Sequence, residues 1–233
     1  INYHGRKKFA EMAKKSGVER YIFNSTCAVY GFNKNTVNEN SKTNPLSTYA
    51  KANLKAEKAI FKLKSKNFKV NILRNSTLFG FSQNLRLDLV INIFVNSFIN
   101  TGNITVDGDG NQWRPFISLN DVNKIYVKII TKKTLPSFIT NLVAFNSTIK
   151  NLAFKITKYF GKSKKNIKFM SRNKDLRNYK TSSKNLKKHL GNINFTNFSY
   201  EINNLVKGIK KYKIKSNKST IRMKFYRSKF LKK

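Results

Sequence analysis

Apolar and polar residues follow two different spacings along the first eighty positions, one typical of helices and one typical of strands. Residues 9–16 have the spacing of the end of an amphipathic helix that stops at Gly17, and residues 18–24 are typical of a short buried strand. The same order returns with helical spacing over 49–64 and a strand over 68–74. A helix followed by a strand, twice over and with short connections, predicts a parallel sheet with crossover helices. The pattern therefore indicates an α/β fold.

The regular order of helix and strand ends after Gly80. Residues 85–100 have helical spacing that ends at Gly102, and a strand over 104–106 precedes a turn-forming cluster over 107–111. Further elements are expected along the rest of the chain: an extended stretch over 116–118, a helix over 122–130 capped by Asn120 or Asp121, a strand over 140–145, and helices over 149–160 and 201–209. No internal repeat and no linker long enough to separate two independent domains is visible.

The charge of the chain raises a separate question. Its 48 Lys and Arg against 10 Asp and Glu give a net charge of +38, which first suggests nucleic acid, an anionic membrane surface or an acidic ligand. Residues 1–150 hold 23 basic and 8 acidic residues, residues 151–233 hold 25 and 2, and no acidic residue follows Lys207. Because lysine and asparagine are abundant throughout, we interpret most of the excess as a compositional bias that steepens toward the C-terminus. Nucleic acid is not the partner we expect.

Cysteine and histidine are scarce. Cys27 is the single cysteine, which excludes an internal disulfide and fits a reducing compartment, so we expect a cytoplasmic protein. Cys27 is interpreted as a small buried filler, and His4 and His189 are too isolated to predict a metal site. No apolar run approaches the roughly 18 residues that would suggest a membrane-spanning helix.

Hydroxyl groups follow the first predicted strand, where Ser25 and Thr26 begin the run that ends at Gly31. The carboxyl end of a parallel strand lies in the crevice where doubly wound sheets bind ligands. Tyr49 follows about twenty residues later, at the start of a predicted helix. A strand-end hydroxyl and a helix-borne tyrosine are the two proton-handling groups of the short-chain dehydrogenase/reductases.

The chain resembles the extended branch of that family, the NAD-dependent sugar-nucleotide epimerases and dehydratases. Asn2-Tyr3-His4-Gly5 is similar to the family's Asn-x-x-Gly-Thr helix start, and Pro45 to Tyr49 is similar to Pro-x-Ser-x-Tyr. The other matching segments are 25–31, 73–80, 113–121, 175–179 and 190–191. They occur in the order found in the family and cover roughly 200 residues of this chain.

The resemblance implies a fold that is the C-terminal part of a doubly wound, Rossmann-type parallel sheet with a small interleaved α/β substrate domain. Residues 1–80 and 112–148 would form the remainder of the NAD-binding domain, and residues 81–111 and 149–206 the substrate-binding part. Residues 207–233 would form a basic tail.

The resemblance also implies site residues. Tyr49 would remove the hydroxyl proton of a nucleotide sugar as general base, while NAD or NADP takes the hydride and Thr26 orients the sugar oxygen. The residues expected at the cofactor are Asn2, Ser25, Asn53, Asn75 and Thr77. Arg114 would bind the pyrophosphate, and Arg86, Asp88 and Asn92 would contact the substrate. Taken without the family, Tyr49 reads as an ordinary aromatic at a helix start, Thr26 as a turn cap, and Arg114 as a surface ion-pairing residue.

Two features depart from the family pattern. Asn53 stands where the Tyr-x-x-x-Lys motif places a lysine, on the same helix face as Tyr49, where an ammonium holds the ribose and stabilises the phenolate. We therefore expect weakened or absent catalysis, which Asn53→Lys should improve. The family's Gly-x-Gly-x-x-Gly turn has no counterpart in residues 1–30, and neither has the acidic residue that reads the adenosine ribose. We interpret the chain as an N-terminally truncated piece that is unstable alone and needs the missing part to bind the cofactor.

A competing function rests on the C-terminal segment. Residues 210–215 and 222–227 interleave basic and aromatic side chains, as single-strand nucleic-acid binders and peripheral membrane proteins do. The alternative is a solvated lysine-rich tail. The partners we expect are a nucleotide sugar and a second copy of the chain in a homodimer, with membrane contact through the tail left open.

Overall fold

The computed structural model describes residues 3–171, 177–217 and 220–221. Its centre is a parallel sheet of three strands in the order β1-β3-β7, where β1 is Arg20–Thr26, β3 is Lys69–Asn75 and β7 is Phe138–Leu142. The register pairs Arg20 with Lys69 and Thr26 with Asn75, so the first two strands end at the same edge. The predicted parallel α/β arrangement is therefore confirmed.

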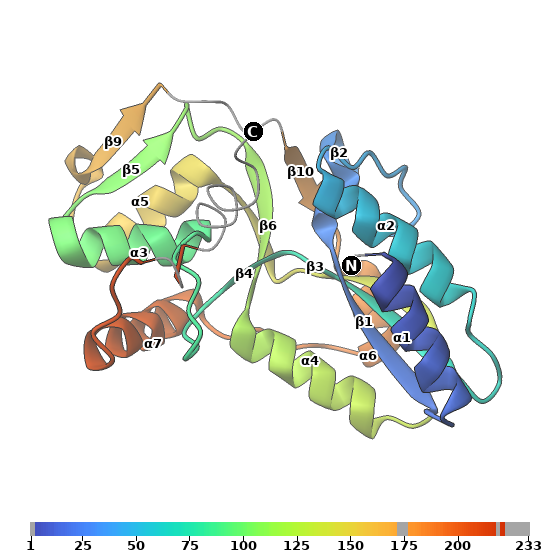
Figure 1. Ribbon diagram of the computed structural model, residues 1–233. Coiled ribbons are helices and arrows are strands. Elements are labelled where there is room, and N and C mark those ends of the chain that lie inside the picture. The colour runs from blue at the N-terminus through green and yellow to red at the C-terminus, as the bar shows by residue number, and fades with distance from the viewer. Residues whose placement is uncertain (1–2, 172–176, 218–219, 222–233) are drawn as a thin grey trace.

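Helices cover both faces of this sheet, as Figure 1 shows. Helices α1 (His4–Lys15) and α2 (Thr48–Phe61) pack on one face, where Phe23, Ile60 and Phe68 belong to a shared apolar core. Helices α4 (Leu119–Thr131) and α6 (Lys184–Leu190) pack on the other face. Because both faces of β3 are enclosed, its residues form a nearly continuous buried run rather than an alternating one.

A second group of elements lies on the opposite side of Figure 1 from α1 and α2. It contains helices α3 (Val90–Thr101), α5 (Ile149–Tyr159) and α7 (Phe198–Lys211), with an apolar core of its own. Its strands are β4 (Thr77–Phe79), β6 (Trp113–Ser118) and β8 (Phe145–Thr148) in one sheet, and β5 (Ile104–Asp107) with β9 (Ile167–Met170) as a parallel pair. A last parallel pair joins β2 (Phe32–Val37) to β10 (Asn178–Thr181).

Several predicted boundaries are wrong. The helix expected over 85–100 begins at Val90, because Leu85 and Leu87 are buried in an irregular segment with turns and the Leu87 N–H donates to the Thr220 carbonyl at 2.8 Å. The strand expected over 140–145 is divided between β7 and β8. The cap of α4 is Ser118, whose hydroxyl accepts from the Asp121 N–H at 3.0 Å, rather than Asn120 or Asp121. The predicted stop at Gly102 is confirmed, with a left-handed φ of 68°.

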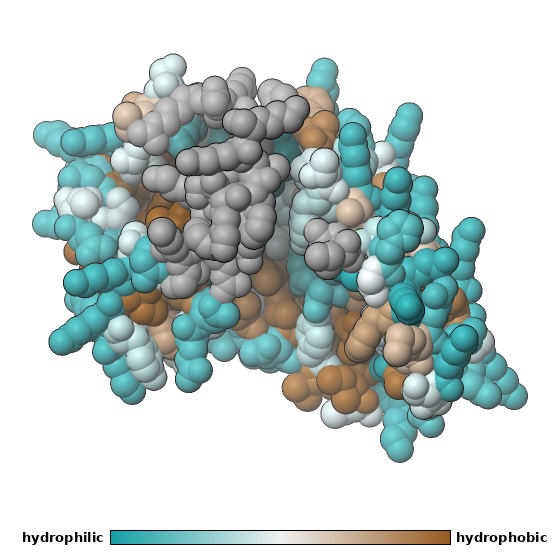
Figure 2. Space-filling model, in the orientation of Figure 1, coloured by the Kyte–Doolittle hydropathy of each residue, from teal (hydrophilic) through white to brown (hydrophobic). Residues whose placement is uncertain are grey.

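The segment expected as a basic tail starts inside α7, which continues to Lys211. Beyond the helix, Tyr212 stacks on Phe81 with ring centroids 5.4 Å apart, and Ile214 and Ile221 pack against the core around α3. Residues 222–227, the second basic and aromatic cluster, lie outside the described residues. In the part of the chain that the structure describes, no helix has the length and apolarity to cross a membrane. In Figure 2, hydrophilic side chains cover much of the left and right parts of the visible face.

Candidate functional site

The carboxyl ends of β1 and β3 form one edge of the site. After Thr26 the chain enters a short 3-10 helix, η1 (Cys27–Tyr30), whose first turn is closed by the Thr26 hydroxyl accepting from the Ala28 N–H at 3.1 Å. Thr26 is therefore a turn cap, and its hydroxyl hydrogen stays available to donate to a ligand. The chain then turns at Gly31, which has a φ of 62°. A Cβ there would lie 1.8 Å from the Asn44 carbonyl oxygen, so a glycine is required.

Tyr49 lies in the first turn of α2, which packs against η1. Ser47 caps this helix by accepting from the Ala50 N–H at 3.1 Å. The Tyr49 side chain is 49% exposed. The Asp88 carboxylate raises the pKa of the Arg86 guanidinium, and the Tyr49 phenol adds a smaller contribution in the same direction. Tyr49 and Arg86 are thus within electrostatic reach of each other, although 37 positions separate them in the sequence.

Asn53 is fully buried one turn further along α2. Its Nδ2 donates to the Tyr49 carbonyl at 2.8 Å, and its Oδ1 accepts from the Arg6 guanidinium on α1 at 2.7 Å. The predicted cofactor residue Asn2 lies outside the described residues. Arg6 was not among the residues expected at the site.

Two polar atoms at the end of β3 have no partner among the described residues: Asn75 Oδ1 and Ser76 Oγ, both buried. The Asn75 amide nitrogen donates to Asn24 Oδ1 at 2.9 Å and to the Ser25 carbonyl at 3.3 Å. Thr77 follows as the half-buried first residue of β4. Buried polar atoms normally have partners, so these two mark a place where a ligand could supply them.

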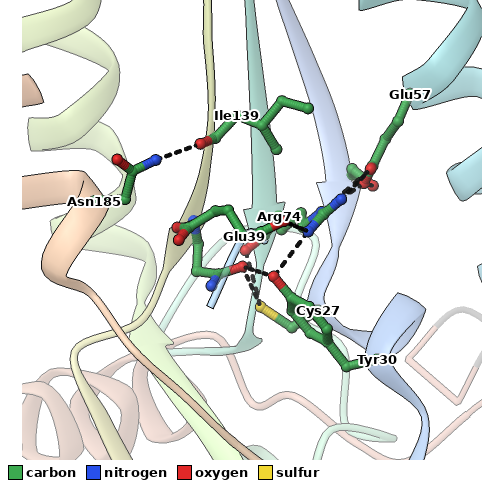
Figure 3. A network of polar contacts seen from close by, with 9 residues as sticks. Cys27, Tyr30, Glu39, Glu57, Arg74, Ile139 and Asn185 are labelled. Carbon is green, nitrogen blue, oxygen red and sulfur yellow. Dashed lines mark hydrogen bonds and ion pairs between the residues drawn. The ribbon is translucent and has the colours of Figure 1, made fainter. Parts of the chain in front are cut away.

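Ser25 has a different environment from its neighbour Thr26. Its hydroxyl forms a short hydrogen bond to the Glu57 carboxylate, which is itself in a buried ion pair with Arg74 at 2.8 Å (Figure 3). The Arg74 Nη1 also donates to the Tyr30 hydroxyl at 2.8 Å. Burial alone would lower the pKa of Arg74, but the hydrogen bonds and charge of Glu57 raise it above its usual value. The network holds β1, β3 and α2 together behind the site.

Sequence reasoning missed Glu57 and Arg74. The signal was present, because Glu57 lies eight residues after Tyr49 on a predicted helix and Arg74 is the last residue of a predicted strand. Cys27 lies beside this network with no exposed surface, and burial raises the pKa of its thiol. The thiol is therefore kept in its unreactive protonated form, in agreement with the interpretation as a filler.

The residues expected at the substrate fall into two places. Arg86 forms an ion pair with Asp88 at 2.9 Å, and Asn92 donates to the Arg86 carbonyl at 3.0 Å while accepting from the Gly80 N–H at 3.2 Å. Asn92 is 2% exposed, so in this state it braces the segment rather than facing solvent.

Arg114 on β6 is separate from this cluster. It is 5% exposed and donates to the Trp113 carbonyl at 2.7 Å and to the Arg177 carbonyl. Its guanidinium lies 5.9 Å from the ring centre of Tyr179. Arg114 is therefore a buried residue at the β6–β10 junction and does not lie on the surface. Asp175, from the motif expected nearby, lies outside the described residues.

A cavity of about 410 Å³ lies beside α2 and is lined in part by Glu57, Arg74 and Ile139. Another, of about 440 Å³, lies at the amino ends of β1 and β3, where Arg20 and Lys69 begin the strands. Neither is lined by Tyr49 or Thr26. Among the described residues, no group of His, Cys, Asp and Glu side chains is arranged to hold a metal ion.

Comparison with known proteins places these features in a family. A protein of Bacillus subtilis named as an uncharacterized UDP-glucose epimerase, YtcB, is 29% identical over 135 residues, which are 58% of this chain and 42% of the relative. A Methanocaldococcus jannaschii protein named as a candidate UDP-glucose 4-epimerase is 32% identical over 164 residues, 68% of this chain and 52% of the relative. The chain thus spans about half the length of the curated relatives it matches.

Solved structures show the same fold. UDP-glucuronic acid 4-epimerase from Bacillus cereus, solved with UDP-glucuronic acid and NAD, superposes with a TM-score of 0.78 at 23% identity, covering 91% of this chain and 68% of that one. The family model described as "NAD dependent epimerase/dehydratase family" matches residues 1–141, the stretch that holds β1, η1, Tyr49, β3 and β6. That match covers more than half of the chain, so the chain belongs to the NAD-dependent epimerase/dehydratase family.

Proposed function

We propose that the chain carries the proton-transfer groups and much of the sugar-binding region of an NAD-dependent epimerase or dehydratase. The observation that carries this proposal is the half-exposed Tyr49 in the first turn of α2, a helix that packs against η1, the 3-10 helix capped by the Thr26 hydroxyl. The family match supplies the reaction class, and the relatives' names point to a nucleotide sugar as the substrate.

The residues at the end of β3 fit the nicotinamide half of the cofactor. Asn75 Oδ1 and Ser76 Oγ are buried acceptors without a partner among the described residues, and a carboxamide or ribose hydroxyl offers the donors they need. NAD, when bound, supplies a hydride acceptor next to the sugar. We assign the nicotinamide side of the cofactor to this end of the sheet.

Proton removal is assigned to Tyr49, and orientation of the sugar oxygen to Thr26. Tyr49 is proposed to remove the proton of a sugar hydroxyl, which requires its phenol to be reachable by the substrate, as its 49% exposure allows. Thr26 accepts from the Ala28 N–H, which fixes the hydroxyl oxygen and leaves its hydrogen to donate to the sugar oxygen. The Glu57–Arg74–Ser25 network is proposed to hold the strand end and α2 in register, without contacting the substrate.

Arg86 is proposed to position an anionic part of the substrate. Its side chain is 39% exposed, it is oriented by Asp88, and it lies within electrostatic reach of Tyr49. Arg114 is assigned to the diphosphate by resemblance, and its 5% exposure means that a diphosphate could reach its guanidinium only if the surrounding side chains moved.

Turnover of UDP-glucose and dTDP-glucose with NAD, followed by chromatography of the nucleotide sugars, tests the proposal. Tyr49→Phe should lower kcat by a factor of about 10² to 10⁴, the usual contribution of a positioned acid or base. The matched control is Tyr200→Phe on α7, where the side chain is 57% exposed and remote from β1. Absence of both binding and turnover in the wild-type chain would overturn the proposal, and equal effects of the two variants would overturn the role of Tyr49.

A further inference from the structure

The contact between Arg6 and Asn53 brings together two positions at which this chain departs from its family. Arg6 follows Gly5 at the place where the Asn-x-x-Gly-Thr helix start has threonine. Asn53 stands where the Tyr-x-x-x-Lys motif has lysine. The two residues are 47 positions apart, on α1 and α2, yet the Arg6 Nη1 lies 2.7 Å from Asn53 Oδ1. Compared with the family pattern, α2 lacks the motif cation at position 53, and α1 places the Arg6 guanidinium in contact with that position.

The amide of Asn53 is an anchor for this cation. A guanidinium can only donate, so it turns the amide oxygen toward Arg6 and the amide nitrogen toward the Tyr49 carbonyl, which accepts at 2.8 Å. The Arg6 guanidinium also lies 5.5 Å from the ring centre of Phe23 on β1. It is therefore held between α1, α2 and the first strand, next to the turn that carries Tyr49.

The charge of Arg6 is not neutralised within the described part of the chain, where none of the ion pairs includes it. The nearest acidic residue on its own helix, Glu11, pairs with Lys7 at 3.5 Å. Both oxygens of Glu57 accept from Arg74, and one also accepts from Ser25. Asn53 has no exposed surface, whereas Arg6 is only partly buried, so Arg6 is the member of the pair that can meet a ligand.

We propose that Arg6, anchored by Asn53, supplies from α1 the cation that the motif lysine supplies from α2, and that it binds the cofactor ribose beside Tyr49. This inference rests on the proposed function for the identity of the ligand. It changes what the sequence implies about Asn53. The asparagine is one half of a relocated cation site rather than a simple loss, and Asn53→Lys would place a second cation against Arg6 instead of restoring activity.

The first test needs no cofactor, because it measures stability. If the side chains at positions 6 and 53 share a space that accommodates one cation, two cations there should destabilise the fold. Urea unfolding of the 233-residue chain is compared for wild type, Asn53→Lys, Arg6→Thr and the double variant. We expect Asn53→Lys to lower the urea concentration at the unfolding midpoint. The double variant should recover at least half of that loss, because it again places only one cation in the shared space. Additive losses in the double variant would overturn the shared site.

The second test is titration calorimetry with NAD. Charge-assisted hydrogen bonds of this kind make a difference of roughly tenfold or more in affinity, so Arg6→Met should weaken the Kd for NAD by at least about tenfold. Arg6→Lys should recover part of the loss, whereas the control Lys8→Met, which removes an exposed charge from the same helix, should stay within about twofold of wild type. Unchanged NAD affinity in Arg6→Met would overturn the cofactor role.

The two tests also separate this inference from the proposed function. If the wild-type chain binds no NAD, the proposed function fails for this chain, and the urea comparison alone decides whether Arg6 and Asn53 share a cation site. If NAD binds and the double variant does not recover, the function stands and the relocated cation is rejected.

Discussion

Replacing Glu57 with glutamine would leave the Arg74 guanidinium in the core without its counter-charge. Glu57 is 2% exposed and Arg74 5% exposed, and their closest N–O distance is 2.8 Å. At that distance, an effective dielectric constant of about 20 gives a Coulomb energy of about 6 kcal/mol. The glutamine side chain keeps one acceptor and the surroundings relax, so we expect a loss of about 3–5 kcal/mol in the free energy of unfolding. For a domain whose whole stability is about 5–15 kcal/mol, this is a large share.

Urea unfolding followed by far-ultraviolet circular dichroism and by the fluorescence of Trp113, the single tryptophan, measures this loss. The control is Glu11→Gln, which breaks the Lys7–Glu11 pair whose side chains are 44% and 39% exposed, and should cost less than about 0.5 kcal/mol. The double variant Glu57→Leu with Arg74→Met removes both charges and should recover most of the stability. A loss in Glu57→Gln no larger than in Glu11→Gln would refute the reasoning.

Other outcomes follow from single positions. Gly31→Ala should cost more than about 2 kcal/mol in urea unfolding, because a Cβ would lie 1.8 Å from a carbonyl oxygen, whereas Gly17→Ala, also at positive φ but with nothing within 4 Å, should cost about 1 kcal/mol. Similar losses at the two positions would contradict this. Cys27 should react with a thiol reagent only after denaturant unfolds the chain, because it has no exposed surface, and stoichiometric labelling of the native chain would argue against its burial. Burial and the charge of Lys188 lower the pKa of His189 in the folded chain, so stability should fall as pH decreases below about 6.5, and His189→Gln should flatten this part of the stability–pH curve.

Most of the main helices and strands of this protein could be predicted from the spacing of apolar residues within each element. The strand β3 and the helix α2 were located within three residues, and the stop of α3 at Gly102 follows from a glycine that accepts a left-handed φ of 68°. The start of α3 was misread, because Leu85 and Leu87 fit the helical spacing although they lie in the irregular segment before the helix. Their place is fixed in part by the hydrogen bond from Leu87 to Thr220, more than 130 positions later.

Pairings between distant segments were not predicted. β2 pairs with β10 and β5 pairs with β9, across more than 60 positions in each case, and each of these strands is four to six residues long. Strands β2, β9 and β10 carry little periodicity of their own and were not predicted, whereas β5 was expected over 104–106 without its partner.

The sequence by itself determined the α/β class, the order of the main elements and, through the family resemblance, the positions of Tyr49 and Thr26. The tertiary structure alone decided that Arg6 meets Asn53, that the Tyr49 phenol contributes to raising the pKa of Arg86, and that Ser25, Glu57 and Arg74 form one buried network. The physical reason is that these interactions depend on distances of about 3 Å between side chains on different elements. Such distances are set by how helices pack on a sheet, and no spacing along the chain records them.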